Sequence, residues 1–139
     1  MGDAGAPPRV LVVADDLIWS TRLVSQATAA GAVSHAVRDL TGLRAAIAEH
    51  PPDLVIVDLS ARAFDGVAAV AESVGVRTRV LAVAQHEDLA LRRRALAAGA
   101  RRVYAYAKVH ADGIALLKRW LDGTEAAAPI EAVAGPRSR

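Results

Sequence analysis

The residues best suited to chemistry are aspartates that follow apolar segments of the chain. Asp58 ends the apolar run Leu54–Val57. The pair Asp15 and Asp16 follows the earlier run Val10–Val13 in the same way. An acidic side chain at the carboxyl end of a buried strand is unfavourable unless something there uses its charge. Two such strand ends in one small domain predict a shared pocket, in which the carboxylates are the groups able to react or to bind.

Five apolar runs alternate along the chain with five helical patterns. This alternation predicts a doubly wound α/β fold, a five-stranded parallel sheet with helices on both faces in three α/β/α layers. In such folds ligand sites lie beyond the carboxyl ends of the strands. The second run is the weakest and is expected at an edge of the sheet. The predicted strands are Val10–Ala14, Ser34–Val37, Leu54–Val57, Val80–Ala84 and Val103–Tyr106.

Acidic residues also stand where helices are expected to begin. Such residues are common helix N-caps, so Asp15 or Asp16 has a simple structural interpretation beside the chemical one. Asp65-Gly66 has the composition of a turn that leads into a helix. The other predicted caps are Asp39, Glu87 or Asp88, and Asp112.

Length and composition narrow the class of protein. The chain has 139 residues, an apolar fraction of 53% and no cysteine, which excludes disulfides and thiolate chemistry. We expect one domain at residues 9–122, between a disordered segment 1–8 and a flexible segment 123–139. No apolar run reaches the roughly 18 residues of a membrane helix, and the first residues do not resemble a signal peptide. A cytoplasmic protein is therefore expected.

Charge is distributed unevenly along the chain. Residues 1–76 carry nine acidic and five basic side chains, whereas residues 77–119 carry three acidic and ten basic ones. The formal net charge of +2 hides this asymmetry. The pattern predicts a polarised molecule with a cationic face.

Three segments together resemble the receiver domains of response regulators. They are Arg9–Asp16, the segment Pro52–Leu59 with Asp65-Gly66 behind it, and Ala95–Ala100. The resemblance spans roughly residues 9–121 and implies the flavodoxin-like (βα)5 receiver fold. It places Asp58 at the phosphoacceptor position. It also implies a divalent cation, usually Mg²⁺, held by Asp15, Asp16, Asp58 and the carbonyl of Ser60, and such oxygen ligands suit Mg²⁺.

The sequence departs from the receiver pattern at the residues that would bind and report a phosphoryl group. Ala84 stands where receivers carry a threonine or serine, and it has no hydroxyl. Tyr106 stands at the position of the receiver lysine, with Lys108 two residues later. Ala14 falls at the first acid of the pair unless a bulge brings Asp15 and Asp16 into place. Arg62 replaces the usual proline of the loop after the acceptor. These switch positions predict weak phosphoryl transfer and weak coupling to distant surfaces.

Basic and aromatic residues gather in the fourth helix, fifth strand and fifth helix. In receivers this face binds partners or forms dimers, and arginine and aromatic side chains are favoured at interface hot spots. We expect a protein partner there, either a sensor kinase or a downstream target, or a second copy of the chain. A membrane partner is not expected, and nucleic acid is disfavoured because no helix-turn-helix pattern is present. The predicted interface residues are Arg92, Arg93, Arg94, Arg101, Arg102, Tyr104, Tyr106, Lys118 and Trp120.

Three functions remain open at this point. The resemblance indicates an atypical, single-domain response regulator in two-component signal transduction, without enzymatic activity of its own. The alternative is a pseudo-receiver, a scaffold or binding module that works without phosphorylation. A phosphatase-like enzyme with an aspartate nucleophile is less favoured, because Ser60 stands where that class needs a second acid.

Overall fold

The computed structural model describes residues 5–125, which form one parallel sheet and five helices. The sheet order is β2-β1-β3-β4-β5, with all pairs parallel. The predicted doubly wound fold is therefore confirmed, and β2 lies at an edge as expected. The elements are β1 (Arg9–Val13), α1 (Leu17–Ala29), β2 (Val33–Val37), α2 (Leu40–Glu49), β3 (Leu54–Asp58), α3 (Gly66–Ser73), β4 (Arg79–Ala84), α4 (Leu89–Ala98), β5 (Arg102–Ala105) and α5 (Tyr106–Leu121).

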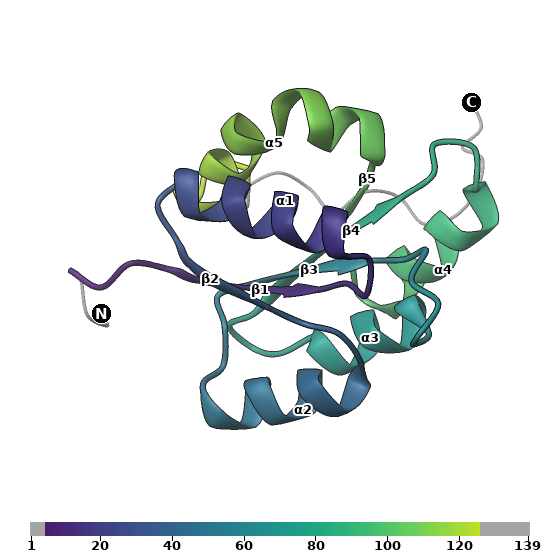
Figure 1. Cartoon of the computed structure of the whole chain (residues 1–139), viewed down its shortest axis with the longest axis horizontal. Helices are drawn as coiled ribbons and strands as arrows, with labels where there is room; N and C mark the ends of the chain where they lie inside the picture. The colour runs from purple at the N-terminus through teal and green to yellow at the C-terminus, as the bar shows by residue number, and fades with distance from the viewer. Residues whose placement is uncertain (1–4, 126–139) are drawn as a thin grey trace.

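The helices cover the sheet in two layers, as Figure 1 shows. Helices α1 and α5 pack together on one face, and α2, α3 and α4 pack in sequence on the other. Each face has its own apolar core, one around Leu43 and Phe64 and one around Leu23 and Trp120. Strand β3 is buried at every position because it lies between β1 and β4 and is covered on both faces.

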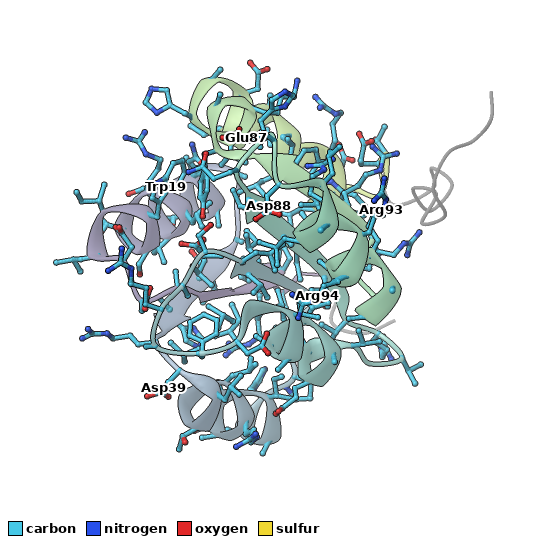
Figure 2. The ribbon with its side chains drawn as sticks, turned by 90° about the vertical axis from the view of Figure 1, so that its right-hand side faces the viewer. Trp19, Asp39, Glu87, Asp88, Arg93 and Arg94 are labelled. Carbon is cyan, nitrogen blue, oxygen red and sulfur yellow. The ribbon has the colours of Figure 1, made fainter. Side chains whose placement is uncertain are left out.

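Side-chain caps set the starts of four helices. Asp16 caps α1, Asp39 caps α2, Asp65 caps α3 and Asp88 caps α4, each by accepting a backbone N–H of the first turn. Because all strands are parallel, these helix starts lie at the edge where the strands end. These four capping aspartates therefore lie at that edge. Figure 2 looks onto it, with Asp39, Glu87 and Asp88 labelled.

The start of the last helix differs from the prediction. Helix α5 begins at Tyr106, directly after β5, and not at Asp112. Asp112 instead has non-helical dihedral angles inside α5 (φ −125°, ψ 17°), where it kinks the helix. Two helical segments meet at this kink, so a segment does begin after Asp112 as predicted, whereas the segment 106–111 before it was not predicted. As a consequence, Tyr106 lies at the first position of a helix.

The segments predicted as terminal extensions lie only partly within the structure. Residues 1–4 and 126–139 lie outside the described residues. Residues 5–8 lead into β1, and the backbone N–H of Glu125 donates to the carbonyl of Arg119 at 3.0 Å. Across residues 5–125, no helix has both the length and the apolar composition needed to span a bilayer.

Candidate functional site

Asp58 lies at the carboxyl end of β3, in the middle of the sheet. Its side chain is only 3% exposed. Asp58 pairs with Val83 of β4, and the next amide, that of Leu59, still donates to the Val83 carbonyl. The strand therefore carries the carboxylate into the base of a pocket of about 520 Å³ that opens at this edge.

The hydroxyl of Tyr106 donates a hydrogen bond to Oδ1 of Asp58. The same oxygen accepts the backbone N–H of Ser60 at 3.0 Å. Tyr106 reaches Asp58 because α5 begins directly after β5 and points this side chain across the ends of β4 and β3. Tyr106, which the sequence resemblance places at the receiver lysine position, thus contacts the carboxylate predicted as phosphoacceptor.

Burial dominates the electrostatics of this pair. It raises the pKa of Asp58, while the hydrogen bonds from Tyr106 and Ser60 lower it and the charges of Asp15 and Asp16 raise it. Burial also raises the pKa of the Tyr106 hydroxyl, and the bond to Asp58 raises it further. Tyr106 therefore keeps its proton at neutral pH and remains a hydrogen-bond donor.

The two other aspartates of the predicted pocket have structural partners. Oδ2 of Asp15 accepts the backbone N–H groups of Arg62 and Ala63, at 2.8 and 2.7 Å. These bonds, that of Ala63 first, lower the pKa of Asp15. Oδ1 of Asp16 accepts the N–H of Trp19 at 3.1 Å, which confirms its interpretation as a helix cap. Both carboxylates line the pocket, but each is occupied by backbone amides.

The three carboxylates predicted to hold a divalent cation each have hydrogen-bond partners in the protein. Among the described residues, no group of three or more histidine, cysteine, aspartate or glutamate side chains is arranged to hold one. Asp15 holds the loop after β3, and Asp16 caps α1. Asp58 accepts two hydrogen bonds on one oxygen. Ser60, whose carbonyl was the fourth predicted ligand, donates its N–H to Asp58. These contacts of Asp15 and Asp16 do not require the backbone bulge that would place the two residues as the acidic pair of a receiver.

The remaining switch positions lie apart from the pocket. Ala84 ends β4, is fully buried and belongs to the core on the α2–α3–α4 face. Lys108 points along α5 and forms an ion pair with Asp112 at 3.0 Å, so it does not contact Asp58. Its role as a switch residue stays a prediction, and in this structure Tyr106 holds the position directly after β5.

Three further pocket residues were not predicted. They are Trp19, Arg62 and Gln85. The ring of Trp19 lies 4.7 Å from that of Tyr106, at an angle of 47°. The guanidinium of Arg22 lies 5.5 Å from the Trp19 ring centre. An aromatic residue in the first turn of a helix that begins beside the pocket is the signal that could have found Trp19. The side of α1 on which it lies depends on how the helix packs.

The predicted interface is corrected in its aromatic part. Trp120 is 2% exposed and belongs to the core beneath α5, where its Nε1 donates to the hydroxyl of Tyr104 at 2.9 Å. Tyr106 faces Asp58. Trp120 is therefore internal, whereas Tyr104 and Tyr106 are half-buried. Arg93, Arg94 and Lys118 are exposed, and Figure 2 shows Arg93 across the view from Trp19.

The other basic residues of this group are less open. Arg101 and Arg102 are half-buried. Arg102 lies 3.8 Å from a carboxylate oxygen of Glu125, and Arg119 lies 3.1 Å from the other. Arg92 is also half-buried. The interface at α4, β5 and α5 stays a prediction, now limited to its exposed basic residues.

Comparisons with known proteins agree on the architecture. No protein-family model and no curated protein matches the sequence. Solved structures do match. A CheY-like response regulator receiver domain protein from Methanospirillum hungatei JF-1 is 19% identical, with a TM-score of 0.73 over 87% of this chain and 98% of that one. The signal receiver domain of NarL from Mycobacterium tuberculosis is 23% identical, with a TM-score of 0.70 over 85% and 98%. The chain has the receiver fold.

A third structure with the receiver fold bears on the acceptor position. It is a response regulator protein from Burkholderia pseudomallei with a phosphorylated aspartic acid, a calcium ion and citrate. It is 19% identical, with a TM-score of 0.69 over 86% of this chain and 71% of that one. At these identities the likeness establishes the fold alone. The fold implied by the sequence resemblance is thus confirmed, and the activity has to be argued from the pocket.

Proposed function

We propose that this chain is a receiver-fold module of two-component signalling that acts through protein contacts without conventional phosphorylation of Asp58. The observation that carries the proposal is the hydrogen bond from the Tyr106 hydroxyl to the Asp58 carboxylate. A neutral phenol in this place holds the acceptor oxygen and offers no positive charge to a phosphoryl group. The pocket then maintains one conformation rather than reporting a modification.

The neighbouring positions support the same conclusion. Ala84 has no hydroxyl with which to bind a phosphoryl oxygen, and Lys108 is paired with Asp112. Asp15 and Asp16 are engaged by backbone amides. A charge-assisted contact to a phosphoryl group is worth on the order of 1–3 kcal/mol. Loss of two such contacts slows transfer by orders of magnitude.

The second candidate is an atypical response regulator that is still phosphorylated on Asp58. Its support is that Asp58 lines a pocket of about 520 Å³ and that a receiver-fold structure with a phosphorylated aspartic acid exists. Tyr106 and Ser60 both bond Oδ1 of Asp58, so in this second function Oδ2 carries the phosphoryl group. The two functions differ in one measurable event, the phosphorylation of Asp58.

Incubation of the full chain with acetyl phosphate and Mg²⁺, followed by intact-mass measurement, separates them. We expect no species heavier by one phosphoryl group in the native chain. The double variant Ala84→Thr with Tyr106→Lys returns the two missing contacts, and it is expected to gain an adduct. An adduct on the native chain that disappears in Asp58→Asn would overturn the proposal.

The contact surface is proposed at α4 and α5, where Arg93, Arg94 and Lys118 are exposed. A photo-crosslinking residue in place of Arg93 is expected to capture a protein partner in cells. The same residue in place of Arg38, an exposed arginine after β2, is the matched control. Equal capture at both positions, or capture unaffected by Arg94→Glu, would argue against this surface.

A further inference from the structure

Gln26 is a polar residue among the buried residues of α1, beside Leu23 and Ala27. It is 8% exposed and lies where α1 packs against α5 on one face of the sheet (Figure 1). Its Nε2 donates to the backbone carbonyl of Val109 at 2.9 Å, whereas its Oε1 is buried without a hydrogen-bond partner among residues 5–125. A buried amide with an unmet acceptor is costly, and an apolar side chain would avoid this cost. The bond to Val109 is therefore what distinguishes Gln26 from an apolar residue at this position.

The carbonyl that Gln26 binds lies in the first segment of α5, residues 106–111, before the kink. In a continuous helix the Val109 carbonyl accepts the N–H four residues on, that of Gly113. Asp112 stands just before Gly113 and has non-helical dihedral angles, so α5 consists of two helical segments that meet there. The side chain of another helix thus supplies a hydrogen-bond donor at the place where α5 is interrupted.

Gly113 leaves room for this amide. The three atoms nearest to a Cβ built on Gly113 are Oε1, Cδ and Nε2 of Gln26, and each would overlap with it. Gly113 is buried and is not among the described glycines with positive φ, so the space it leaves is what matters here. Because the overlapping atoms end a flexible side chain, an alanine at this position would displace the amide and not the helix backbone.

The first segment of α5 begins with Tyr106, whose hydroxyl donates to Asp58. Helix α1 contacts this segment at two points. The ring of Trp19 lies 4.7 Å from that of Tyr106 at its start, and Gln26 binds the Val109 carbonyl further along. Trp19 and Gln26 stand about two helical turns apart and so lie on one face of α1. The direction of the segment, and with it the place of the Tyr106 hydroxyl, is therefore set by α1.

We propose that Gln26 is a positioning residue for the Tyr106–Asp58 hydrogen bond. Its amide holds the Val109 carbonyl and so sets the direction of the first segment of α5. Without the amide, this carbonyl takes its donor from its own helix, the kink at Asp112 straightens, and the Tyr106 hydroxyl moves away from the carboxylate. The inference rests on the proposed function, in which this hydrogen bond maintains the conformation of the pocket.

Gln26 acts from outside the Asp58 pocket, which it does not line. It lines a separate groove of about 690 Å³ between α1 and α5, together with His110 of the first segment. A change in how α1 and α5 pack at this groove therefore reaches Asp58 through the bond between Gln26 and Val109.

The test follows the tyrosine hydroxyl groups by NMR. Labelling the full chain with tyrosine that carries ¹³C at Cζ gives two signals, because the sequence has two tyrosines. Cζ bears the hydroxyl and responds to its hydrogen bond. Tyr106→Phe assigns the signals, and Asp58→Ala gives the position of the Tyr106 signal without its acceptor. We expect Gln26→Leu and Gly113→Ala to move the Tyr106 signal most of the way to that position and to leave the Tyr104 signal in place.

The two variants reach the same result by different routes, since one removes the donor and the other displaces it. Ser25→Ala removes an exposed hydroxyl from the wall of the same groove and is the matched control, which should move neither signal. An unmoved Tyr106 signal in either folded variant would overturn the inference, because a glutamine with a purely structural role changes stability alone. Equal movement of both tyrosine signals, or unfolding of both variants, would overturn it as well.

The Asp58→Ala reference separates this inference from the proposed function. If Asp58→Ala moves the Tyr106 signal and Gln26→Leu does not, only the role of Gln26 is refuted. If Asp58→Ala leaves the Tyr106 signal in place, the hydrogen bond itself is absent, and both proposals are refuted.

Discussion

The two edges of the sheet differ in how their charged groups are satisfied. At the carboxyl edge, Asp15, Asp16 and Asp58 all accept backbone N–H groups, and Asp58 also accepts a hydroxyl. At the amino edge, Arg9 and Arg79 keep buried Nε–H groups without an acceptor among the described residues.

This difference has a simple origin and a functional meaning. Loops and helix starts at the carboxyl edge expose N–H groups, which are partners for carboxylates. At the carboxyl edge, the aspartates that line the pocket therefore have their hydrogen-bond partners within the protein. At the amino edge, the Nε–H groups of Arg9 and Arg79 are buried and have no acceptor among the described residues.

The largest loss of stability is expected when a side-chain atom is added at the carboxyl edge of the sheet. A Cβ on Gly66 would lie 2.7 Å from the Cα of Leu59, so Gly66→Ala forces the loop after β3 to move. We expect a loss of about 3 kcal/mol in the free energy of unfolding, measured by urea denaturation. Gly5→Ala, with nothing within 4 Å, is the control and should be neutral. A neutral Gly66→Ala would show that this loop is not held closed.

Removal of the Asp15 carboxylate is expected to cause the second-largest loss of stability. Asp15→Ala leaves the N–H groups of Arg62 and Ala63 without their acceptor and should destabilise the fold by about 2 kcal/mol. Because these amides lower the pKa of Asp15, its contribution is complete above the pKa of an unfolded aspartate, about 4. It is lost as the pH falls through the lower folded value. Denaturation at several pH values checks this, and a loss that does not shrink in acid would contradict it.

The Tyr106–Asp58 hydrogen bond is expected to contribute differently to stability at neutral and at acidic pH. Tyr106→Phe should cost about 1.5 kcal/mol at neutral pH, where the buried carboxylate loses a donor. Burial raises the pKa of Asp58, so protonation stabilises the fold as the pH falls, and this contribution is lost as the pH rises through the folded pKa. The cost of Tyr106→Phe should therefore shrink in acid, because a protonated Asp58 needs no donor.

Tyr104→Phe is the matched control for that experiment. The Tyr104 hydroxyl accepts from Trp120 and contacts no carboxylate in the described structure. Its loss, about 1 kcal/mol, should be the same at neutral and acidic pH. Parallel pH profiles for the two variants would mean that the Tyr106 hydroxyl does not act on Asp58.

The smallest effect is expected at the amino edge. Arg9→Met and Arg79→Met remove unpaired buried donors and keep an apolar stem, so stability should change by less than about 0.5 kcal/mol or rise slightly. Thermal denaturation without added anions is the measurement. A loss of stability as large as that expected for Asp15→Ala would show that these guanidinium groups have structural partners. The two edges of the sheet would then not differ in how their charged groups are satisfied.

Much of the fold was predictable because local signals agreed with one another. The uniformly apolar Leu54–Val57 indicated a central strand, and the caps Asp39, Asp65 and Asp88 stand where the helices begin. The first part of α5 was not predicted, because Tyr106 has no capping signal before it; the predicted helix corresponds to the segment after the kink at Asp112.

The candidate site was predictable in its members but not in its contacts. The positions of Asp15, Asp16 and Asp58 follow from the ends of β1 and β3. The sequence could not show that Asp15 turns to the loop after β3, or that Trp19 packs on Tyr106. Those contacts depend on side-chain directions that only helix packing decides.

By itself, the sequence determined the alternation of strands and helices, the acidic strand ends and the missing receiver residues at Ala84 and Tyr106. Those properties depend on residue type and spacing along the chain. Only the tertiary structure decided that Tyr106 bonds Asp58 and that Trp120 is internal. It also decided that Arg9 and Arg79, 70 positions apart, line one pocket. The physical reason is that strand order and register bring together residues that are far apart in the sequence. Nothing in the sequence around such residues indicates that they will be in contact.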